Sequence, residues 1–213
     1  PSVGGTWYAN RYPGARVDIQ SLEYSFAFDE ALQQEWSWSE RYAAQPELLR
    51  YANHVADRFG LRDGILLDTR LEAAQWDEAS ARWQARASTG DRWQARFLVM
   101  ATGPLSTTNL PRFPGLDSFR GRSFHTGRWP HEPVDFTGER VAVIGTGSSA
   151  VQSIPIIAAQ ATELTVFQRT PAYSVPARNG PLDPAHAARI KADYAGFRAR
   201  NRLMPGALGS RPF

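Results

Sequence analysis

A repeating apolar pattern predicts a helix over residues 46–59. Apolar side chains recur there at helical spacing and would share one face; they are Leu48, Ala52, Val55 and Phe59. Pro46 suits the first helical position because its missing N–H leaves no hydrogen bond unmade, and Gly60 suits the end of the helix. His54 lies off the apolar stripe, so we expect it at the surface.

Shorter elements are expected before this helix. Residues 24–28 alternate aromatic and small side chains, which favours a short strand. Residues 29–38 begin with acidic residues and favour a helix. Residues 1–20 combine glycine, proline and large aromatic residues, which is typical of a loop that approaches a ligand closely. The alternative is a loop that only fills the core with its aromatic side chains.

Alternating polar and apolar residues predict an antiparallel meander of three strands. The expected strands are Leu71–Gln75, Trp83–Ala87 and Arg92–Arg96, joined by turns at residues 77–80 and 89–91.

Two short apolar runs flank the meander. Ile65–Leu67 is expected to be buried, and Phe97–Met100 has the pattern of a buried parallel strand. The second run leads into Ala101-Thr102-Gly103. Small residues at the carboxyl end of a strand are typical of ligand sites in open α/β sheets.

A second α/β unit is expected from Val141 onward. Its first strand leads into Gly145-Thr146-Gly147-Ser148-Ser149-Ala150, the pattern of a dinucleotide-binding turn. The glycines let the backbone approach a pyrophosphate, and the N-terminus of the next helix faces the phosphate charge.

The remaining elements follow in order. A helix over residues 148–160, kinked or shortened by Pro155, and a strand over residues 164–167 complete the unit. A helical stretch rich in Arg and Ala is predicted from Pro181 to about Leu203. We expect residues 204–213 to be poorly ordered.

The end of the second strand indicates which nicotinamide cofactor would bind. An NAD site places Asp or Glu about 20 residues after the glycines, to bind the ribose hydroxyl. This chain has Gln168-Arg169-Thr170 there and no carboxylate. Arg169 offers a planar cation and Thr170 a hydroxyl to a 2′-phosphate, so the sequence favours NADP(H).

Composition excludes several classes of function. The chain has 213 residues, 42% hydrophobic and 21% charged, and a net charge of +3 carried by scattered arginines. Such a balance indicates a globular protein, and we expect no nucleic-acid partner. The absence of cysteine excludes disulfides, thiol catalysis and cysteine metal sites, and no metal site is expected. No apolar segment approaches the length of a membrane span, so we expect a cytoplasmic protein without membrane contact.

Two longer motifs carry a family resemblance. The first is Phe119-x-Gly121-x-x-x-His125-x-x-x-Trp129-Pro130, and the second runs from Gly4-Gly5-x-Trp7 to Tyr12-Pro13-Gly14-x-x-x-Asp18. Together with the two nucleotide-binding turns, they make the chain resemble the type I Baeyer–Villiger monooxygenases along essentially its whole length. The phenylacetone and steroid monooxygenase branch is especially similar.

This resemblance implies an α/β fold with two Rossmann-like domains, one for FAD and one for NADP, with the meander in the FAD part. It implies that NADPH reduces the flavin, that O₂ then gives a C4a-peroxyflavin, and that a ketone becomes an ester or lactone. We expect a small-molecule ketone and O₂ as substrates. We also expect a monomer.

The resemblance also implies roles for individual residues. FAD would contact Thr6, Trp7, Tyr8, Ala9, Asp18, Tyr24 and Leu71. NADP would contact Arg16, Val17, Asp18, Gly145, Thr146, Gly147, Ser148, Ser149, Ala150, Val151, Gln152, Arg169 and Thr170. The Asp18 carboxylate would pair with an active-site arginine. His125 would couple NADP binding to domain position, rather than carry protons.

Parts of the family pattern are not found in this sequence. The glycine motif for the FAD pyrophosphate is expected upstream of Gly4, and the active-site arginine beyond Phe213. We therefore expect an internal fragment that is inactive alone. Its expected parts are a partial FAD domain over residues 1–103, a linker over 104–139, and the N-terminal part of an NADP domain over 140–213.

Two other functions remain open at this point. A related flavin monooxygenase could oxidise nitrogen or sulfur, although Trp129-Pro130 favours the ketone branch. A non-catalytic NADP-binding module is the other alternative, and the Gly4–Asp18 motif disfavours it. The sequence does not indicate which ketone is used.

Overall fold

The longest element of the chain is α4 (Gln45–Arg58), which organises the helical part of the molecule. This computed structural model describes residues 2–105 and 107–204. Leu48 and Val55 are buried on the apolar face of α4. The helix that the apolar stripe predicted is therefore confirmed.

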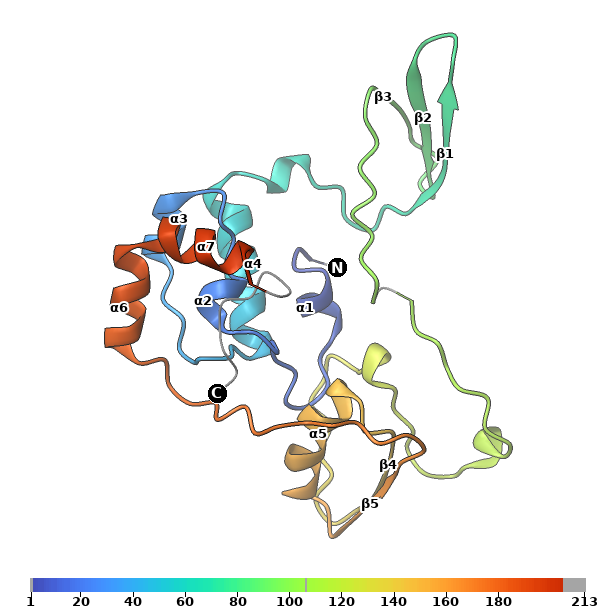
Figure 1. Cartoon of the computed structure of the whole chain (residues 1–213). Helices are drawn as coiled ribbons and strands as arrows, with labels where there is room; N and C mark the ends of the chain where they lie inside the picture. Colours follow the sequence, from blue (N-terminus) through green and yellow to red (C-terminus); the bar gives the residue numbers. More distant parts are fainter. Residues whose placement is uncertain (1, 106, 205–213) are drawn as a thin grey trace.

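Three short helices precede α4 in the chain and surround it in Figure 1. They are α1 (Thr6–Ala9), α2 (Ser21–Tyr24) and α3 (Glu30–Glu35). Helix α3 is shorter than the predicted 29–38 and begins where the Asp29 carboxylate accepts a hydrogen bond from the N–H of Leu32 at 2.6 Å. His54 is only partly exposed, because it packs beside Trp36 and pairs with Glu35, so its predicted surface position is only partly right.

The strand predicted over residues 24–28 is wrong. Helix α2 occupies its start, and the N–H of Phe26 donates to the hydroxyl of Tyr51 at 3.0 Å instead of to a neighbouring strand. The rings of Phe26 and Phe28 lie against Tyr51 and Phe59, with centroid distances of 5.8 Å and 5.1 Å. The alternating aromatic residues thus cover α4 instead of forming one face of a sheet.

The antiparallel meander is confirmed and projects away from the rest of the molecule (Figure 1). It consists of β1 (Leu71–Asp77), β2 (Arg82–Ala87) and β3 (Arg92–Ala95). Trp76 on β1 lies opposite Trp83 on β2, with their rings edge to face. Such cross-strand aromatic pairs stabilise a small sheet and fix its register.

The two apolar runs beside the meander are not buried, contrary to prediction. Leu66 is 61% exposed, and Phe97 and Val99 are 77% and 83% exposed. Neither run forms a strand, and among residues 2–105 and 107–204 no segment pairs with them. An apolar strand is buried only when strands or helices cover it on both faces. A 3₁₀ turn, η1 (Arg62–Gly64), precedes the first run.

The second α/β unit is confirmed. Strand β4 (Arg140–Ile144) pairs in parallel with β5 (Glu163–Phe167), and α5 (Ser148–Ala158) connects them. Pro155 lies inside α5, which continues for about one more turn beyond it. The strand–turn–helix–strand order is what a dinucleotide-binding turn requires.

The C-terminal helical stretch is divided in two. The helices α6 (Pro184–Ala192) and α7 (Tyr194–Arg202) meet at Asp193, whose carboxylate accepts a hydrogen bond from the N–H of Gly196 at 2.9 Å. Residues 205–213, most of the tail that was expected to be poorly ordered, lie outside the described residues.

Two apolar clusters hold these elements. The first contains Leu32, Leu48 and Tyr51, and the buried ring of Tyr194 brings α7 against it. The second contains Trp129, Phe136 and Ile157, so it joins the linker to α5. The linker also contains two 3₁₀ turns, η2 (Leu116–Ser118) and η3 (Thr126–Arg128). The predicted domain boundaries at 103 and 139 stay a prediction. Among the residues placed in the structure, no helix is long and apolar enough to cross a membrane.

Candidate dinucleotide-binding site

The turn after β4 has the open geometry that a bound pyrophosphate needs. Gly145 has a φ of 107°, which a residue with a side chain rarely adopts, and its N–H donates to the carbonyl of Phe167 at 2.8 Å. Apart from the adjoining residues, no atom of the described part of the chain lies within 4 Å of the place where a Cβ would stand on Gly145 or Gly147. The first N–H groups of α5 have no partner within a helix and are free to bind an anion. These residues therefore fit a dinucleotide phosphate.

Arg169 and Thr170 come two and three residues after the end of β5, at the same sheet edge. Ile144 and Phe167, the last residues of β4 and β5, lie opposite each other in the parallel register. The side chain of Gln168 donates to the hydroxyl of Thr146 at 2.9 Å, which ties the turn to the end of β5. Within residues 2–105 and 107–204, the guanidinium of Arg169 has no ion-pair or hydrogen-bond partner. It is thus available to an anionic group.

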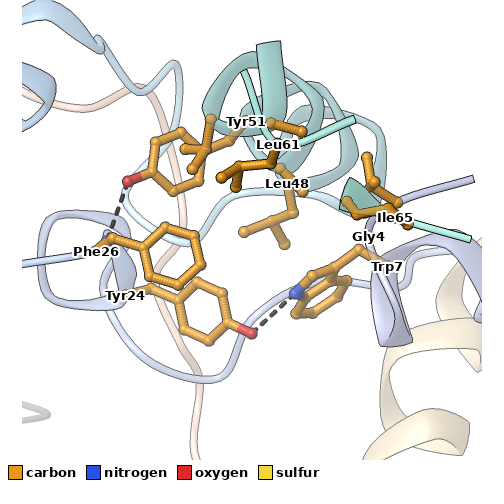
Figure 2. A pocket seen from close by; sticks show the side chains of 12 residues that line it. Gly4, Trp7, Tyr24, Phe26, Leu48, Tyr51, Leu61 and Ile65 are labelled. Carbon is orange, nitrogen blue, oxygen red and sulfur yellow. Dashed lines mark hydrogen bonds between the residues drawn. The ribbon is translucent and has the colours of Figure 1, made fainter. Parts of the chain in front are cut away.

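The Gly4–Asp18 loop forms one side of a cavity of about 380 Å³. Figure 2 shows Trp7 and Tyr24 side by side along one edge of it, and the indole N–H of Trp7 donates to the Tyr24 hydroxyl at 2.8 Å. Most of the lining is apolar and comes from α4 and the residues after it, including Leu48, Leu61 and Ile65. Two of the residues predicted to contact FAD therefore share one cavity.

Tyr51 is a cavity residue that the sequence reasoning missed. It lies on α4, three residues after Leu48 and four before Val55, so the apolar spacing could have placed it on the same face. Its hydroxyl accepts the N–H of Phe26, and burial raises its pKa above the usual value of a tyrosine. The hydroxyl therefore stays neutral at physiological pH.

Thr6, Tyr8, Ala9 and Leu71, which are also predicted to contact the flavin, do not line this cavity. Thr6, Tyr8 and Ala9 belong to α1, and the ring of Tyr8 lies against His131 of the linker with a centroid distance of 5.1 Å. Leu71 is the first residue of β1 and is exposed.

Gln152 on α5 connects the N-terminal loop to the dinucleotide turn. Its Oε1 accepts from the Tyr12 hydroxyl at 3.0 Å and from the N–H of Arg16 at 3.3 Å. Its Nε2 donates to the carbonyl of Arg16 at 3.2 Å and to Oδ1 of Asp18 at 2.8 Å. Gln152 thereby joins a residue predicted for the flavin side, Asp18, to the helix predicted to bind NADP.

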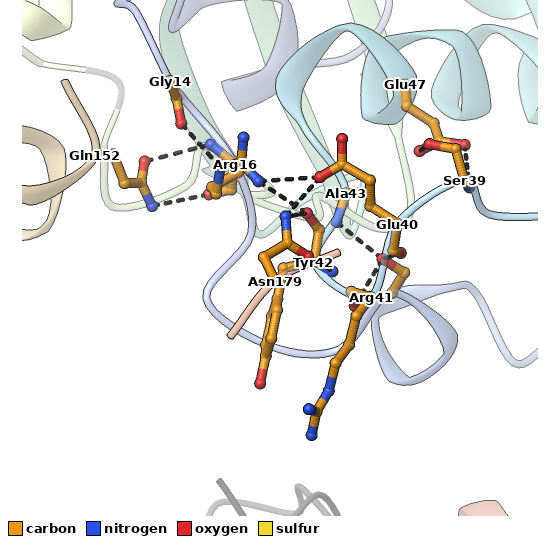
Figure 3. A network of polar contacts seen from close by, with 11 residues as sticks. Gly14, Arg16, Ser39, Glu40, Arg41, Tyr42, Ala43, Glu47, Gln152 and Asn179 are labelled. Carbon is orange, nitrogen blue, oxygen red and sulfur yellow. Dashed lines mark hydrogen bonds and ion pairs between the residues drawn. The ribbon is translucent and has the colours of Figure 1, made fainter. Parts of the chain in front are cut away.

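Arg16 lies in a second polar network, shown in Figure 3. Its guanidinium pairs with the carboxylate of Glu40 at 3.0 Å, and the Glu40 carboxylate also accepts a hydrogen bond from Asn179. Asn179 in turn accepts the N–H of Tyr42 at 3.0 Å. The neighbour of Arg16, Val17, is buried in the first apolar cluster. Sequence reasoning did not find this network, because its members are far apart in the chain.

His125 has a local role in the linker. Its Nδ1 accepts the N–H of Gly127 at 3.1 Å and so begins η3. Four residues after His125, the ring of Trp129 is buried between Phe124 and Phe136. The fingerprint motif therefore forms a turn followed by a core residue, and the coupling role of His125 stays a prediction.

Known proteins share both the sequence pattern and the fold of this chain. The family model described as pyridine nucleotide-disulphide oxidoreductase matches residues 16–195. A solved structure described as oxidised steroid monooxygenase bound to NADP is 57% identical, with a TM-score of 0.93, over 100% of this chain and 40% of that chain.

Two curated relatives are similar at the level of sequence. A Baeyer–Villiger monooxygenase of Pseudooceanicola batsensis is 46% identical over 90% of this chain and 35% of its own length. The phenazine N-monooxygenase PhzNO1 of Lysobacter antibioticus is 44% identical over 90% of this chain and 35% of its own length. The chain thus spans about a third of the curated relatives it matches. These matches confirm the resemblance that the two motifs carried.

Proposed function

Since this chain belongs to the pyridine nucleotide-disulphide oxidoreductase family, we propose that the full-length protein is an FAD- and NADPH-dependent Baeyer–Villiger monooxygenase. One observation carries the proposal: the loop of residues 12–18 lies against α5, directly behind the dinucleotide turn. An enzyme that transfers a hydride from a nicotinamide to a flavin must hold both cofactors side by side. The 57% identity to a steroid monooxygenase supports the same assignment.

FAD and NADPH would supply oxygen activation and reducing electrons when bound, and the residues of this chain would hold and orient them. The N–H groups at the start of α5 would bind the NADP pyrophosphate, and Arg169 and Thr170 its 2′-phosphate. The aromatic wall of Trp7 and Tyr24 would exclude water from one side of the flavin. The Asp18 carboxylate would hold an arginine side chain in place near the flavin.

The direct test uses the full-length protein. Purified protein should contain FAD, and it should oxidise NADPH faster when a ketone such as phenylacetone is added. The ester product should carry one oxygen atom from ¹⁸O₂, measured by mass spectrometry. A flavoprotein that consumes NADPH but makes no ester from any of a panel of linear, cyclic and aryl ketones would contradict the ketone assignment.

A second candidate function is oxidation of a nitrogen atom, which the similarity to a phenazine N-monooxygenase favours. The same assay with phenazines and thioethers in place of ketones distinguishes the two. Formation of an N-oxide without any ester would favour this alternative. NADPH binding without bound flavin would instead indicate a non-catalytic module.

Three further expectations belong to the same proposal. The 213-residue chain alone is expected to show no NADPH oxidation with a ketone, and turnover by the chain alone would contradict this. We propose a ketone and O₂ as the substrates. A monomeric, cytoplasmic protein stays a prediction.

A further inference from the structure

The side chain of Gln152 both accepts a hydrogen bond from the backbone of the N-terminal loop and donates one to it. Its amide oxygen accepts the N–H of Arg16 and its amide nitrogen donates to the carbonyl of the same residue, at 3.3 Å and 3.2 Å. One side-chain amide thus bonds to both the N–H and the carbonyl of Arg16, although the two residues are 136 positions apart in the sequence. Two simultaneous bonds of this kind fix the orientation of the loop backbone as well as its distance from α5. The loop is fixed to α5 at this point.

The backbone carbonyl of Gln152 also lies close to the same loop, at Gly14. A Cβ added at Gly14 would lie 2.3 Å from the carbonyl oxygen of Gln152, and Gly14 has a φ of 77°. Only glycine therefore allows the loop to approach α5 this closely. The loop and the helix are in contact through the main chain of Gln152 as well as through its side chain.

The same amide also sets the position of the Asp18 carboxylate. The Nε2 atom of Gln152 donates to Oδ1 of Asp18 at 2.8 Å, and this is a charge-assisted hydrogen bond. Both polar atoms of the Gln152 side chain are therefore engaged by the loop. Gln152 is the fifth residue of α5 and lies one turn after Ser148, the first residue of the helix. A phosphate bound at the start of α5 would act on the same rigid helix that carries Gln152.

We propose that Gln152 is a positioning residue, which couples occupancy of the dinucleotide turn to the placement of Asp18. The inference rests on the proposed function, because it assumes that NADP(H) binds at the turn. Gln152 then acts through Asp18 and Arg16 and not chiefly as a ligand of the phosphate. Removing its N–H donors should free the Asp18 loop while leaving the turn able to bind NADP⁺.

The test compares Gln152→Glu with Tyr12→Phe in the full-length protein. Gln152→Glu keeps the shape of the side chain but loses both N–H donors and places a carboxylate beside Asp18. Tyr12→Phe removes one hydrogen bond to the same Oε1 and leaves the contacts with Arg16 and Asp18 intact. Hydrogen exchange of residues 12–18, read by mass spectrometry with and without NADP⁺, and the dissociation constant for NADP⁺ are both measured.

In the wild type and in Tyr12→Phe, we expect NADP⁺ to slow exchange of the 12–18 amides at least threefold. In Gln152→Glu we expect that protection to disappear, with the dissociation constant for NADP⁺ changed less than threefold. Protection retained in Gln152→Glu would overturn the proposal. So would a tenfold weaker NADP⁺ affinity with protection intact at saturation, because Gln152 would then be a cofactor ligand. A wild type that binds no NADP⁺ would instead overturn the proposed function.

Discussion

The indole N–H of Trp7 donates to the hydroxyl of Tyr24 at 2.8 Å, and their rings meet edge to face with centroids 5.8 Å apart. This pair joins α1 to the end of α2 and forms the polar rim of an otherwise apolar cavity. The orientation of the Trp7 ring therefore depends on the Tyr24 hydroxyl.

The first prediction concerns this pair. Tyr24→Phe should weaken FAD binding about twofold to tenfold, because loss of one neutral hydrogen bond costs about 0.5–1.5 kcal/mol. The measurement is titration of FAD into flavin-free full-length protein, followed by flavin fluorescence. Tyr173→Phe is the matched control, since Tyr173 is 100% exposed. Equal affinities in the two variants would show that the Tyr24 hydroxyl does not orient Trp7 for the flavin.

The second prediction separates backbone strain from close contact. Gly14→Ala and Gly138→Ala both place a side chain at a positive φ, of 77° and 79°, but only at Gly14 would the new Cβ meet another atom. Each should cost about 1–2 kcal/mol through backbone strain.

Gly14→Ala should cost about 1–3 kcal/mol more, because the Gln152 carbonyl cannot move aside as a side chain could. Denaturant unfolding of the full-length variants measures the difference. If both variants lose the same stability, the loop does not lie against α5 as closely as the structure places it.

Local sequence signals predicted the local elements well. The stripe on α4, the pairings within β1–β3 and the β4–β5 pairing each join residues at most 23 positions apart. The predicted burial of Ile65–Leu67 and Phe97–Met100 was wrong, because burial of an apolar run depends on distant segments that cover it.

In the candidate site, too, local features could be predicted and contacts between distant residues could not. The turn at Gly145 and the position of Arg169 two residues after β5 could be predicted from a spacing motif. The bond between Gln152 and Asp18 joins residues 134 positions apart, and no pattern in one sequence reports such a pairing. Arg16, Val17 and Asp18 were therefore predicted as ligand contacts, and the docking of their loop on α5 was found only in the structure.

The third prediction concerns cofactor choice. Arg169→Ala should weaken NADP⁺ binding about tenfold to a hundredfold, because hydrogen bonds to a charged group contribute about 1.5–3 kcal/mol. Binding of NAD⁺, which has no 2′-phosphate, should change less than about threefold on the same reasoning. Isothermal titration of both nucleotides measures the two affinities.

Arg92→Ala on the exposed strand β3 is the control for loss of one positive charge. If Arg169→Ala and Arg92→Ala weaken NADP⁺ binding equally, Arg169 contributes only general electrostatic attraction. If NAD⁺ and NADP⁺ lose affinity in parallel, Arg169 does not contact the 2′-phosphate.

The last prediction concerns Tyr194, the buried ring that brings α7 against the N-terminal cluster. Its hydroxyl donates to the carbonyl of Leu22 at 3.0 Å and lies 3.2 Å from Oγ of Ser25. Burial raises the pKa of Tyr194 above its usual value, and this outweighs the opposite effect of the Arg198 cation over its ring. The fold therefore favours the neutral hydroxyl.

Because the pKa of Tyr194 is raised in the folded state, its contribution to stability must decrease at alkaline pH. The stabilising contribution of Tyr194 is fully present below the unfolded value of about 10, and it is lost as the pH rises through the folded value. Tyr194→Phe should cost about 1 kcal/mol at pH 8 through the lost hydrogen bond. Above about pH 10 the variant should lose stability less steeply than the wild type, because it has no phenol there to ionise on unfolding.

Denaturant unfolding at pH 8 and at closely spaced alkaline values measures both effects, with Tyr173→Phe as the exposed control. Tyr51, whose pKa burial also raises, should leave a residual alkaline slope in Tyr194→Phe. Identical alkaline slopes in Tyr194→Phe and the wild type would mean that the Tyr194 phenol is not buried. The packing of α7 against the N-terminal cluster would then be wrong.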